Sequence, residues 1–306
     1  MTTRPVLLVL LAMAIAINAT AQMQVPLYDS TIPGGRQTQM KETFLKSDDG
    51  IPLVKNIANP SMFLFLPETM EPVPCVLIFA GGGYEVQAFE HEGNEVARRL
   101  NAEGIAAAVI RYSLPADGLI ENKSIGPLQD AQQAILTIRE NAAAWNIMPH
   151  KTGLLGFSAG GHLAATAGTH FQNPVIKHGH GNEKVHHSLR PDFMVLIYPV
   201  ISMTDSLTHL GSRRNLLGQA PGEELINFFS NELHVDGQTP PTFRVHAKDD
   251  PAVPVANSLN FASKLKAHNI PYELFLYEKG GHGFGLVNKL DNRDWLRPAI
   301  DWIRNL

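Results

Sequence analysis

Short apolar runs alternate with amphipathic segments along most of this chain. The runs are apolar throughout and rich in strand-forming residues, which predicts strands buried on both faces. We predict strands at residues 62–67, 75–80, 105–112, 152–158, 192–200, 242–248 and 272–278. The segments between them place apolar residues at helical spacing, which predicts helices at 93–104, 127–145, 258–269 and 293–306. This alternation is typical of an α/β fold with a mostly parallel central sheet and helices on both faces.

Two stretches depart from this rhythm. Residues 22–59 are polar with scattered Pro and Gly, and we interpret them as an entry arm followed by an edge hairpin. Residues 201–241 hold Pro, Gly and short helical pieces such as "GEELINFFS". Inserted segments of this length often shape a substrate pocket. Helices that simply pack on the sheet edge explain the segment equally well.

The N-terminus has the three parts of a signal peptide in the right order. Arg4 supplies the positive charge, residues 6–17 form an apolar run too short to span a bilayer comfortably, and "ATA" at 19–21 is a cleavage site. We therefore predict a signal peptide over 1–21 and a single catalytic domain over 22–306. The mature chain is expected in the periplasm or outside the cell, without insertion into the membrane.

Composition and charge narrow the function classes. The chain has 306 residues, 44% hydrophobic and 18% charged, with a formal net charge of −4. No basic patch stands out, so nucleic acid is not an expected partner. Cys75 is the single cysteine, which excludes an intramolecular disulfide, and its place in a predicted strand favours a buried, inert thiol.

The stretch "GFSAGGHLA" places Ser158 between a predicted strand and a predicted helix. It matches G-x-S-x-G through Gly156 and Gly160. A nucleophile on a sharp strand-to-helix turn sits in strained backbone, and the residues two before and two after come too close to carry bulk. The N–H groups at the start of the helix would favour a developing oxyanion. We therefore predict that Ser158 is a nucleophile.

A serine needs a base, and the base needs an acid that orients it. Downstream of Ser158, "HAKDDPAVPV" holds Asp249 and Asp250, and "EKGGHGFG" holds His282. Each follows a predicted strand, at the end of the sheet where active sites of parallel sheets collect. The order Ser, Asp, His is the one that this kind of nucleophile turn uses. The sequence therefore predicts a catalytic triad.

The glycine run "FAGGGY" follows the strand predicted at 75–80. Glycines let backbone N–H groups turn toward a ligand, so we predict an oxyanion hole made by Gly82 and Gly83 with the N–H of Ala159. The histidine that often precedes three such glycines is Ala80 here, so its hydrogen-bond brace is missing. Tyr84 either lines the acyl pocket or packs in the core.

Other polar clusters are weighed against plain structural roles. "KHGHGNEKVHH" has no regular spacing, so a solvated loop is favoured over a zinc site; its candidate ligands are His178, His180, Glu183, His186 and His187. We predict no metal and no cofactor. Glu92 is expected either to contact sugar hydroxyls or to cap the following helix. His162 is expected to hydrogen-bond locally within its helix.

Together these motifs resemble the α/β-hydrolase fold and, more narrowly, secreted bacterial carbohydrate esterases of the acetyl xylan esterase and feruloyl esterase-like group. The resemblance covers roughly residues 74–302 and rests on "AGGGYEVQAFEHEGNEVARRLN", "GFSAGGHLA", "TPPTFRVHAKDDPAVPVANSL" and "EKGGHGFG". In that group the acid precedes "VP" by three positions, which selects Asp250 over Asp249 as the partner of His282.

The resemblance implies a serine esterase that removes acyl groups, most of all acetyl, from plant-wall hemicellulose such as xylan through an acyl-enzyme. Its expected partner is an esterified carbohydrate, while the oligomeric state stays open. The alternatives are a feruloyl esterase or a general carboxylesterase or lipase, for which "LINFF" at 225–229 would supply an apolar pocket. A serine peptidase and a non-catalytic binding protein are further alternatives.

Overall fold

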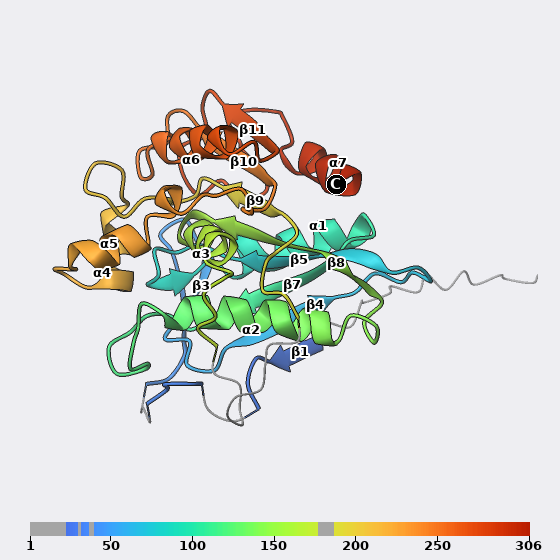
Figure 1. Ribbon diagram of the computed structural model, residues 1–306, viewed down its shortest axis with the longest axis horizontal. Helices are drawn as coiled ribbons and strands as arrows, with labels where there is room; N and C mark the ends of the chain where they lie inside the picture. The colour runs from blue at the N-terminus through green and yellow to red at the C-terminus, as the bar shows by residue number, and fades with distance from the viewer. Residues whose placement is uncertain (1–22, 30–31, 37–39, 177–186) are drawn as a thin grey trace, which may run out of the picture.

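An eight-stranded sheet forms the centre of the protein (Figure 1). The computed structural model describes residues 23–29, 32–36, 40–176 and 187–306. The predicted signal peptide, residues 1–21, lies outside them. In spatial order the strands are β1 (Met23–Pro26), β4 (Ser61–Phe65), β7 (Ala106–Arg111), β5 (Val73–Phe79), β8 (Ile147–Phe157), β9 (Met194–Ile197), β10 (Thr242–Ala247) and β11 (Tyr272–Tyr277).

The sheet is mostly parallel, as predicted. The pairs β1–β4 and β4–β7 are antiparallel, and every pair from β7 to β11 is parallel. Strand β7 illustrates why the predicted strands lack alternation of apolar and polar residues. Its residues Ala106, Ala108 and Ile110 face one apolar cluster, and Ala107 and Val109 face the other. A strand covered on both faces has no position for a polar side chain.

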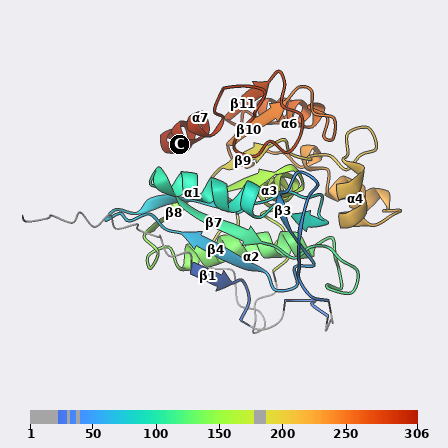
Figure 2. The ribbon, with the colours of Figure 1, turned by 180° about the vertical axis from the view of Figure 1, so that it is seen from behind.

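Helices cover both faces of the sheet (Figures 1 and 2). On one face lie α2 (Gly126–Glu140), α3 (Ser158–Thr169) and α6 (Ala256–Ala267), whose apolar residues join the larger core cluster. On the other face lie α1 (Glu95–Ala102) and α7 (Leu296–Asn305). The predicted α/β-hydrolase architecture, with helices on both faces of a mostly parallel sheet, is confirmed.

The hairpin expected within residues 22–59 is present, but it is not at the edge of the main sheet. Strands β2 (Thr43–Lys46) and β3 (Pro52–Lys55) pair with each other and with the two-residue strand β6 (Val86–Gln87). The two edge strands of the main sheet are β1 and β11 instead. Because β6 lies in the loop that follows β5, the small sheet ties the hairpin to that loop.

The segment 201–241 contains helices α4 (Leu210–Leu217) and α5 (Glu223–Phe228) and a 3-10 turn at Asn231–Leu233. Figure 1 shows α4 and α5 together at one side of the molecule. Helix α4 buries Leu216 and Leu217, whereas α5 contains no buried residue. The segment thus packs partly on the core and partly projects from it.

Candidate active site

The turn at Ser158 has the backbone that its motif predicts. Strand β8 ends at Phe157, α3 begins at Ser158, and Ser158 has a φ of 50°, in the left-handed region. A Cβ on Gly156 would lie 2.3 Å from the Gly160 carbonyl oxygen, and a Cβ on Gly160 would lie 2.1 Å from the Phe79 carbonyl oxygen. Both contacts are impossible for a side chain, so the two glycines are a steric requirement of the turn.

A chain of hydrogen bonds runs from the Ser158 side chain to a buried carboxylate. The Ser158 Oγ lies 2.9 Å from His282 Nε2, and His282 Nδ1 lies 2.7 Å from Asp250 Oδ2. Asp250 follows β10 and His282 follows β11, at the same edge of the sheet as Ser158. The structure therefore brings together the three residues that the sequence predicted.

The Asp250 carboxylate is held by groups that favour its charged form. Its Oδ1 accepts hydrogen bonds from the backbone N–H groups of Ala252 and Val253, each at 2.9 Å. Burial alone would raise the pKa of Asp250, but the hydrogen bonds from His246 and His282 outweigh it and hold the pKa well below its usual range. The carboxylate is consequently ionised at every pH at which His282 is neutral and can act as a base.

The neighbouring Asp249 has a different structural role. Its Oδ1 accepts hydrogen bonds from the backbone N–H groups of Gly280 and Gly281, each at 2.9 Å. These glycines immediately precede His282, so Asp249 shapes the loop that carries the imidazole. The choice of Asp250 over Asp249 agrees with this geometry.

The glycine loop after β5 lies directly against Ser158. A Cβ on Gly81 would lie 2.9 Å from the Ser158 Cβ, and a Cβ on Gly82 would lie 2.2 Å from the Val86 carbonyl oxygen. Gly82 and Gly83 have φ values of 128° and 64°. Within the described residues their N–H groups have no acceptor, whereas the Gly81 N–H is bound to a carboxylate.

That carboxylate belongs to Glu92, and its position corrects both expectations for this residue. Glu92 is 4% exposed, so it does not reach out to sugar hydroxyls, and it does not cap a helix. Its Oε2 accepts from the Gly81 N–H at 2.7 Å, and its Oε1 accepts from the Tyr198 hydroxyl at 2.7 Å. With both oxygens bound inside the protein, Glu92 positions the glycine loop.

Tyr198 extends this bracing to the loop of His282. Its hydroxyl accepts a hydrogen bond from the Gly285 N–H at 3.0 Å, and its ring centroid lies 4.8 Å from that of His282. From the π-helical turn Glu90–Asn94 that holds Glu92, His91 Nε2 also contacts the Gly283 carbonyl oxygen at 3.1 Å. Such turns are frequent at functional sites.

Ala80 stands where a histidine often supplies a hydrogen bond to the glycine loop, and two other side chains hold the loop instead. The Tyr112 hydroxyl donates to the Ala80 carbonyl oxygen at 2.8 Å, and Glu92 holds the next residue of the loop. The sequence analysis missed Tyr112, Tyr198 and His246. Tyr112 and Tyr198 contact residues that are distant in the chain, and His246 lies within the apolar strand β10, so no sequence spacing singles out any of the three.

Tyr84 is buried and belongs to the wall between the glycine loop and the core. It is 2% exposed, and its hydroxyl lies 2.8 Å from His162 Nδ1. His162 Nε2 donates to the Phe229 carbonyl oxygen at 2.8 Å, so the prediction of local helical hydrogen bonds was wrong. Burial lowers the pKa of His162 to about 4, which keeps its imidazole neutral.

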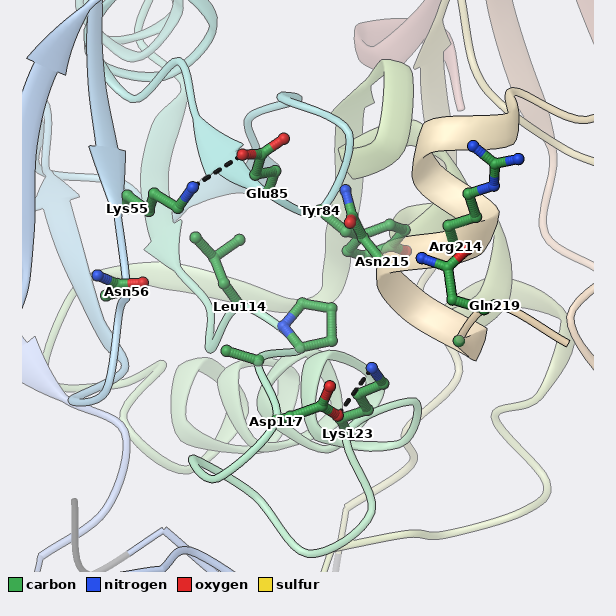
Figure 3. Close-up of a pocket in the computed structure, with 13 residues that line it drawn as sticks. Lys55, Asn56, Tyr84, Glu85, Leu114, Asp117, Lys123, Arg214, Asn215 and Gln219 are labelled. Atoms are coloured by element: carbon green, nitrogen blue, oxygen red, sulfur yellow. Dashed lines mark hydrogen bonds and ion pairs between the residues drawn. The ribbon is translucent and has the colours of Figure 1, made fainter. Parts of the chain in front are cut away.

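A polar cavity of about 470 Å³ adjoins the glycine loop (Figure 3). Tyr84 and Glu85, which follow the glycines, line one part of it, and Asn215 and Gln219 of the α4 region line another. Figure 3 shows the Lys55–Glu85 and Asp117–Lys123 ion pairs on its walls, at 2.8 and 2.9 Å. Its lining is mainly polar, with Leu114 and Pro115 as apolar members.

The remaining candidate ligands are the four histidines and one glutamate of the stretch 178–187. His178, His180, Glu183 and His186 lie outside the described residues, and His187 is exposed. Across 23–29, 32–36, 40–176 and 187–306, no group of three or more His, Cys, Asp or Glu side chains is arranged to hold a metal ion. Over those same ranges, no helix has both the length and the apolar character to cross a membrane.

Comparison with known proteins agrees with this fold. The chain is 36% identical in sequence to an acetyl ester-xyloside bifunctional hydrolase from Caldicellulosiruptor lactoaceticus, whose crystal structure superposes with a TM-score of 0.76. That alignment covers 92% of this chain and 96% of the other. The fold and the relatives place the chain in the class of α/β-hydrolase-fold carboxylic ester hydrolases.

Within that class the chain belongs to the BD-FAE family, which matches residues 62–265. It is 34% identical over 275 residues to a protein of Xylanibacter ruminicola named acetylxylan esterase, covering 88% of this chain and 52% of that protein. It is 35% identical over 229 residues to endo-1,4-beta-xylanase B of Butyrivibrio fibrisolvens, covering 75% and 35%. The chain thus spans about a third to a half of the length of these two curated relatives. The predicted resemblance to carbohydrate esterases is confirmed.

Proposed function

We propose that this chain is a serine esterase that removes acyl groups, chiefly acetyl, from plant-wall hemicellulose such as xylan. The observation that carries the proposal is the hydrogen-bonded chain from Ser158 through His282 to Asp250, at 2.9 and 2.7 Å. A glycine loop with unpaired N–H groups lies against the serine within the described residues. The relatives named acetylxylan esterase and xylanase support the choice of substrate.

In the first half of the reaction the Ser158 Oγ attacks the ester carbonyl carbon while His282 Nε2 takes the hydroxyl proton. The carbonyl oxygen becomes an oxyanion, and the N–H groups of Gly82, Gly83 and Ala159 are the proposed donors to it. When the tetrahedral intermediate collapses, the sugar oxygen leaves with the proton from His282. The acyl group then stays on Ser158.

In the second half a water molecule replaces the sugar. His282 takes a proton from this water, its oxygen attacks the acyl carbon, and the same N–H groups stabilise the second oxyanion. Collapse returns the proton from His282 to Ser158 and releases the carboxylic acid. Asp250 stays ionised throughout, because its hydrogen bonds hold its pKa low despite burial, and it keeps the His282 Nδ1 proton in place.

The surroundings of the site favour a hydroxyl-rich leaving group over a lipid. The cavity lined by Tyr84 and Glu85, the two residues that follow Gly83 in the chain, has a mainly polar lining. The apolar run 225–229, which the lipase alternative assigns to a lipid pocket, packs in part against the core, while Leu225 and Phe228 also line a cavity of about 350 Å³ that includes none of Ser158, Asp250 and His282. Phe229 is 1% exposed, and Leu225, Ile226 and Phe228 pack against the main core cluster.

The proposed setting of this reaction is the periplasm or the exterior of the cell. It rests on the charged, apolar and small-residue parts of 1–21, so export stays a prediction. Mass spectrometry of the secreted protein should give the intact mass of a chain that begins at Gln22. A secreted chain that keeps residues 1–21 would contradict the prediction.

The deciding experiment measures release of acetate and ferulate from acetylated and feruloylated xylan, with the Ser158→Ala variant as the control. Acetate release by the native chain alone supports the proposal. Ferulate release without acetate, or a preference for octanoyl over acetyl esters of one alcohol, would replace it by a feruloyl esterase or a lipase. Labelling by a fluorophosphonate that disappears in Ser158→Ala separates an enzyme from a binding protein.

A further inference from the structure

His209 begins helix α4 and has no part in the hydrogen-bonded chain of Ser158. It is the N-cap residue of the helix, and its Nδ1 lies 3.2 Å from the Ser212 backbone nitrogen and 2.8 Å from the Ser212 Oγ. A backbone N–H can only donate a hydrogen bond, so His209 Nδ1 is the acceptor. The proton of the neutral ring is therefore on Nε2.

The Nε2–H of His209 is available to a ligand. Within the described residues no acceptor lies within hydrogen-bond distance of it. The Nε2 atom is also not fully buried, so a ligand can reach it. The side chain is half-buried. Burial and, to a lesser extent, the nearby charge of His282 lower the pKa of His209, so its ring stays neutral to a lower pH than that of an ordinary histidine.

His209 stands beside the proposed oxyanion hole. A Cβ on Gly83 would lie 3.8 Å from the His209 Cε1, with open space otherwise. The Gly83 carbonyl oxygen accepts from the Asn215 side chain of the same helix at 2.8 Å. Helix α4 is therefore hydrogen-bonded to the glycine loop through Asn215, and its N-cap residue His209 lies close to Gly83.

The polar cavity extends along this helix, away from the glycine loop. Asn215 lines it together with Tyr84, and its volume of about 470 Å³ is within the range of about 300–1,000 Å³ typical of ligand pockets. An acetyl group needs far less room. The alcohol side of the ester is therefore the part that fits there. His209 does not line the cavity; it lies at the other end of α4, beside Gly83.

We propose that His209 is a substrate-binding residue whose Nε2–H donates a hydrogen bond to a hydroxyl or ring oxygen of the sugar leaving group. The inference rests on the proposed esterase function and adds to it a residue that recognises the alcohol side of the substrate. The sugar lies along α4, in the cavity lined by Tyr84 and Asn215.

The test compares two acetyl esters that share an acyl group and differ in the alcohol. The leaving group of an acetylated xylo-oligosaccharide has hydroxyl and ring oxygens that can accept a hydrogen bond from His209. The leaving group of 4-nitrophenyl acetate is 4-nitrophenol, which has no sugar oxygens. His209→Asn keeps a good N-cap for α4 but removes the distal N–H. Because a neutral hydrogen bond contributes modestly, we expect kcat/KM on the oligosaccharide to fall about threefold to tenfold. On 4-nitrophenyl acetate it should change less than about twofold, since that substrate never makes the bond.

Two further variants separate recognition from folding. His209→Gln carries an amide N–H farther along the side chain, and we expect it to recover part of the loss on the oligosaccharide. His268→Asn, at the exposed end of α6, is the matched control and should leave both rates unchanged. Equal losses of His209→Asn on both esters, or no loss on the oligosaccharide, would overturn the inference. If the native chain hydrolyses neither ester, the proposed function itself fails.

Discussion

The loops at the carboxyl edge of the sheet and the segment 201–241 face the same site but are built differently. The edge loops hold each other in place: Glu92 binds Gly81, Tyr198 binds Gly285, and Asp249 binds Gly280. In the segment, α5 has no buried residue. The edge loops are held by hydrogen bonds from their backbone N–H groups to side chains of other loops. Helix α5 of the segment packs against the core only through partly exposed side chains.

The difference teaches where motifs arise. Reaction chemistry needs backbone N–H groups and a serine in fixed positions, and only certain residues permit that backbone, as at Gly156, Gly160 and Gly82. Recognition of a sugar needs only side chains that reach it, which is the role proposed for His209. Many sequences satisfy the second requirement, so the segment has no recognisable motif.

The largest expected effect belongs to the edge loops. Ser158→Ala removes the nucleophile from its turn, and kcat on acetyl esters should fall by about 10³-fold or more, because members of a triad act as a unit. The thermal midpoint should change little, since the substitution deletes one hydroxyl. Steady-state kinetics and thermal denaturation check both statements, and substantial remaining turnover in a clean preparation would exclude Ser158 as the nucleophile.

The two adjacent aspartates test the comparison within one loop. Asp250→Asn should lower kcat by about 10³-fold or more, because the amide favours the wrong tautomer of His282. Asp249→Asn keeps an oxygen that can accept from Gly280 and Gly281, so its loss should be about tenfold at most. The pair is compared by kcat at one pH, and the assignment of the acid would be wrong if the two losses were reversed.

His162 joins the two regions, because it binds Tyr84 beside the glycine loop and Phe229 of the segment. Burial lowers its folded pKa to about 4, while the unfolded chain keeps the ordinary value near 6.5. Between these values the unfolded state binds the extra proton, so stability falls as the pH drops from about 6.5 to about 4.

The loss due to His162 amounts to at most about 3 kcal/mol. His162→Gln removes this titration, so the stability gap between native and variant should narrow by about that amount over the same pH range. Urea denaturation at a series of pH values measures it. Asp130, with a pKa raised to about 6, titrates in both proteins and cancels in the difference. A constant gap would show that His162 is not held neutral.

Glu92→Gln tests the bracing of the edge loops with a smaller effect. The amide keeps one acceptor but cannot accept from both the Gly81 N–H and the Tyr198 hydroxyl. We expect kcat to fall about tenfold, less than the roughly 10²–10³ that follows deletion of an oxyanion donor. KM for 4-nitrophenyl acetate should stay nearly constant. A rise in KM at unchanged kcat would return Glu92 to the substrate-binding role that the sequence suggested.

By itself the sequence determined the strands and helices, the α/β fold class and the residues that meet at Ser158. Each of these depends on a local rule. Apolar runs such as 75–80 mark buried strands, glycines two before and two after Ser158 mark its turn, and Asp250 and His282 follow their strands directly. The family to which the chain belongs follows from the same stretches.

Only the tertiary structure decided how these parts are supported. Glu92 meets Tyr198 across 106 residues, and His162 meets Phe229 across 67. His209 lies close to Gly83 because α4 is held to the glycine loop through Asn215, a contact that no spacing records. Local steric rules act between neighbours in the chain and leave a pattern in the sequence. A hydrogen bond between distant segments requires only that the folded backbone bring a donor to an acceptor.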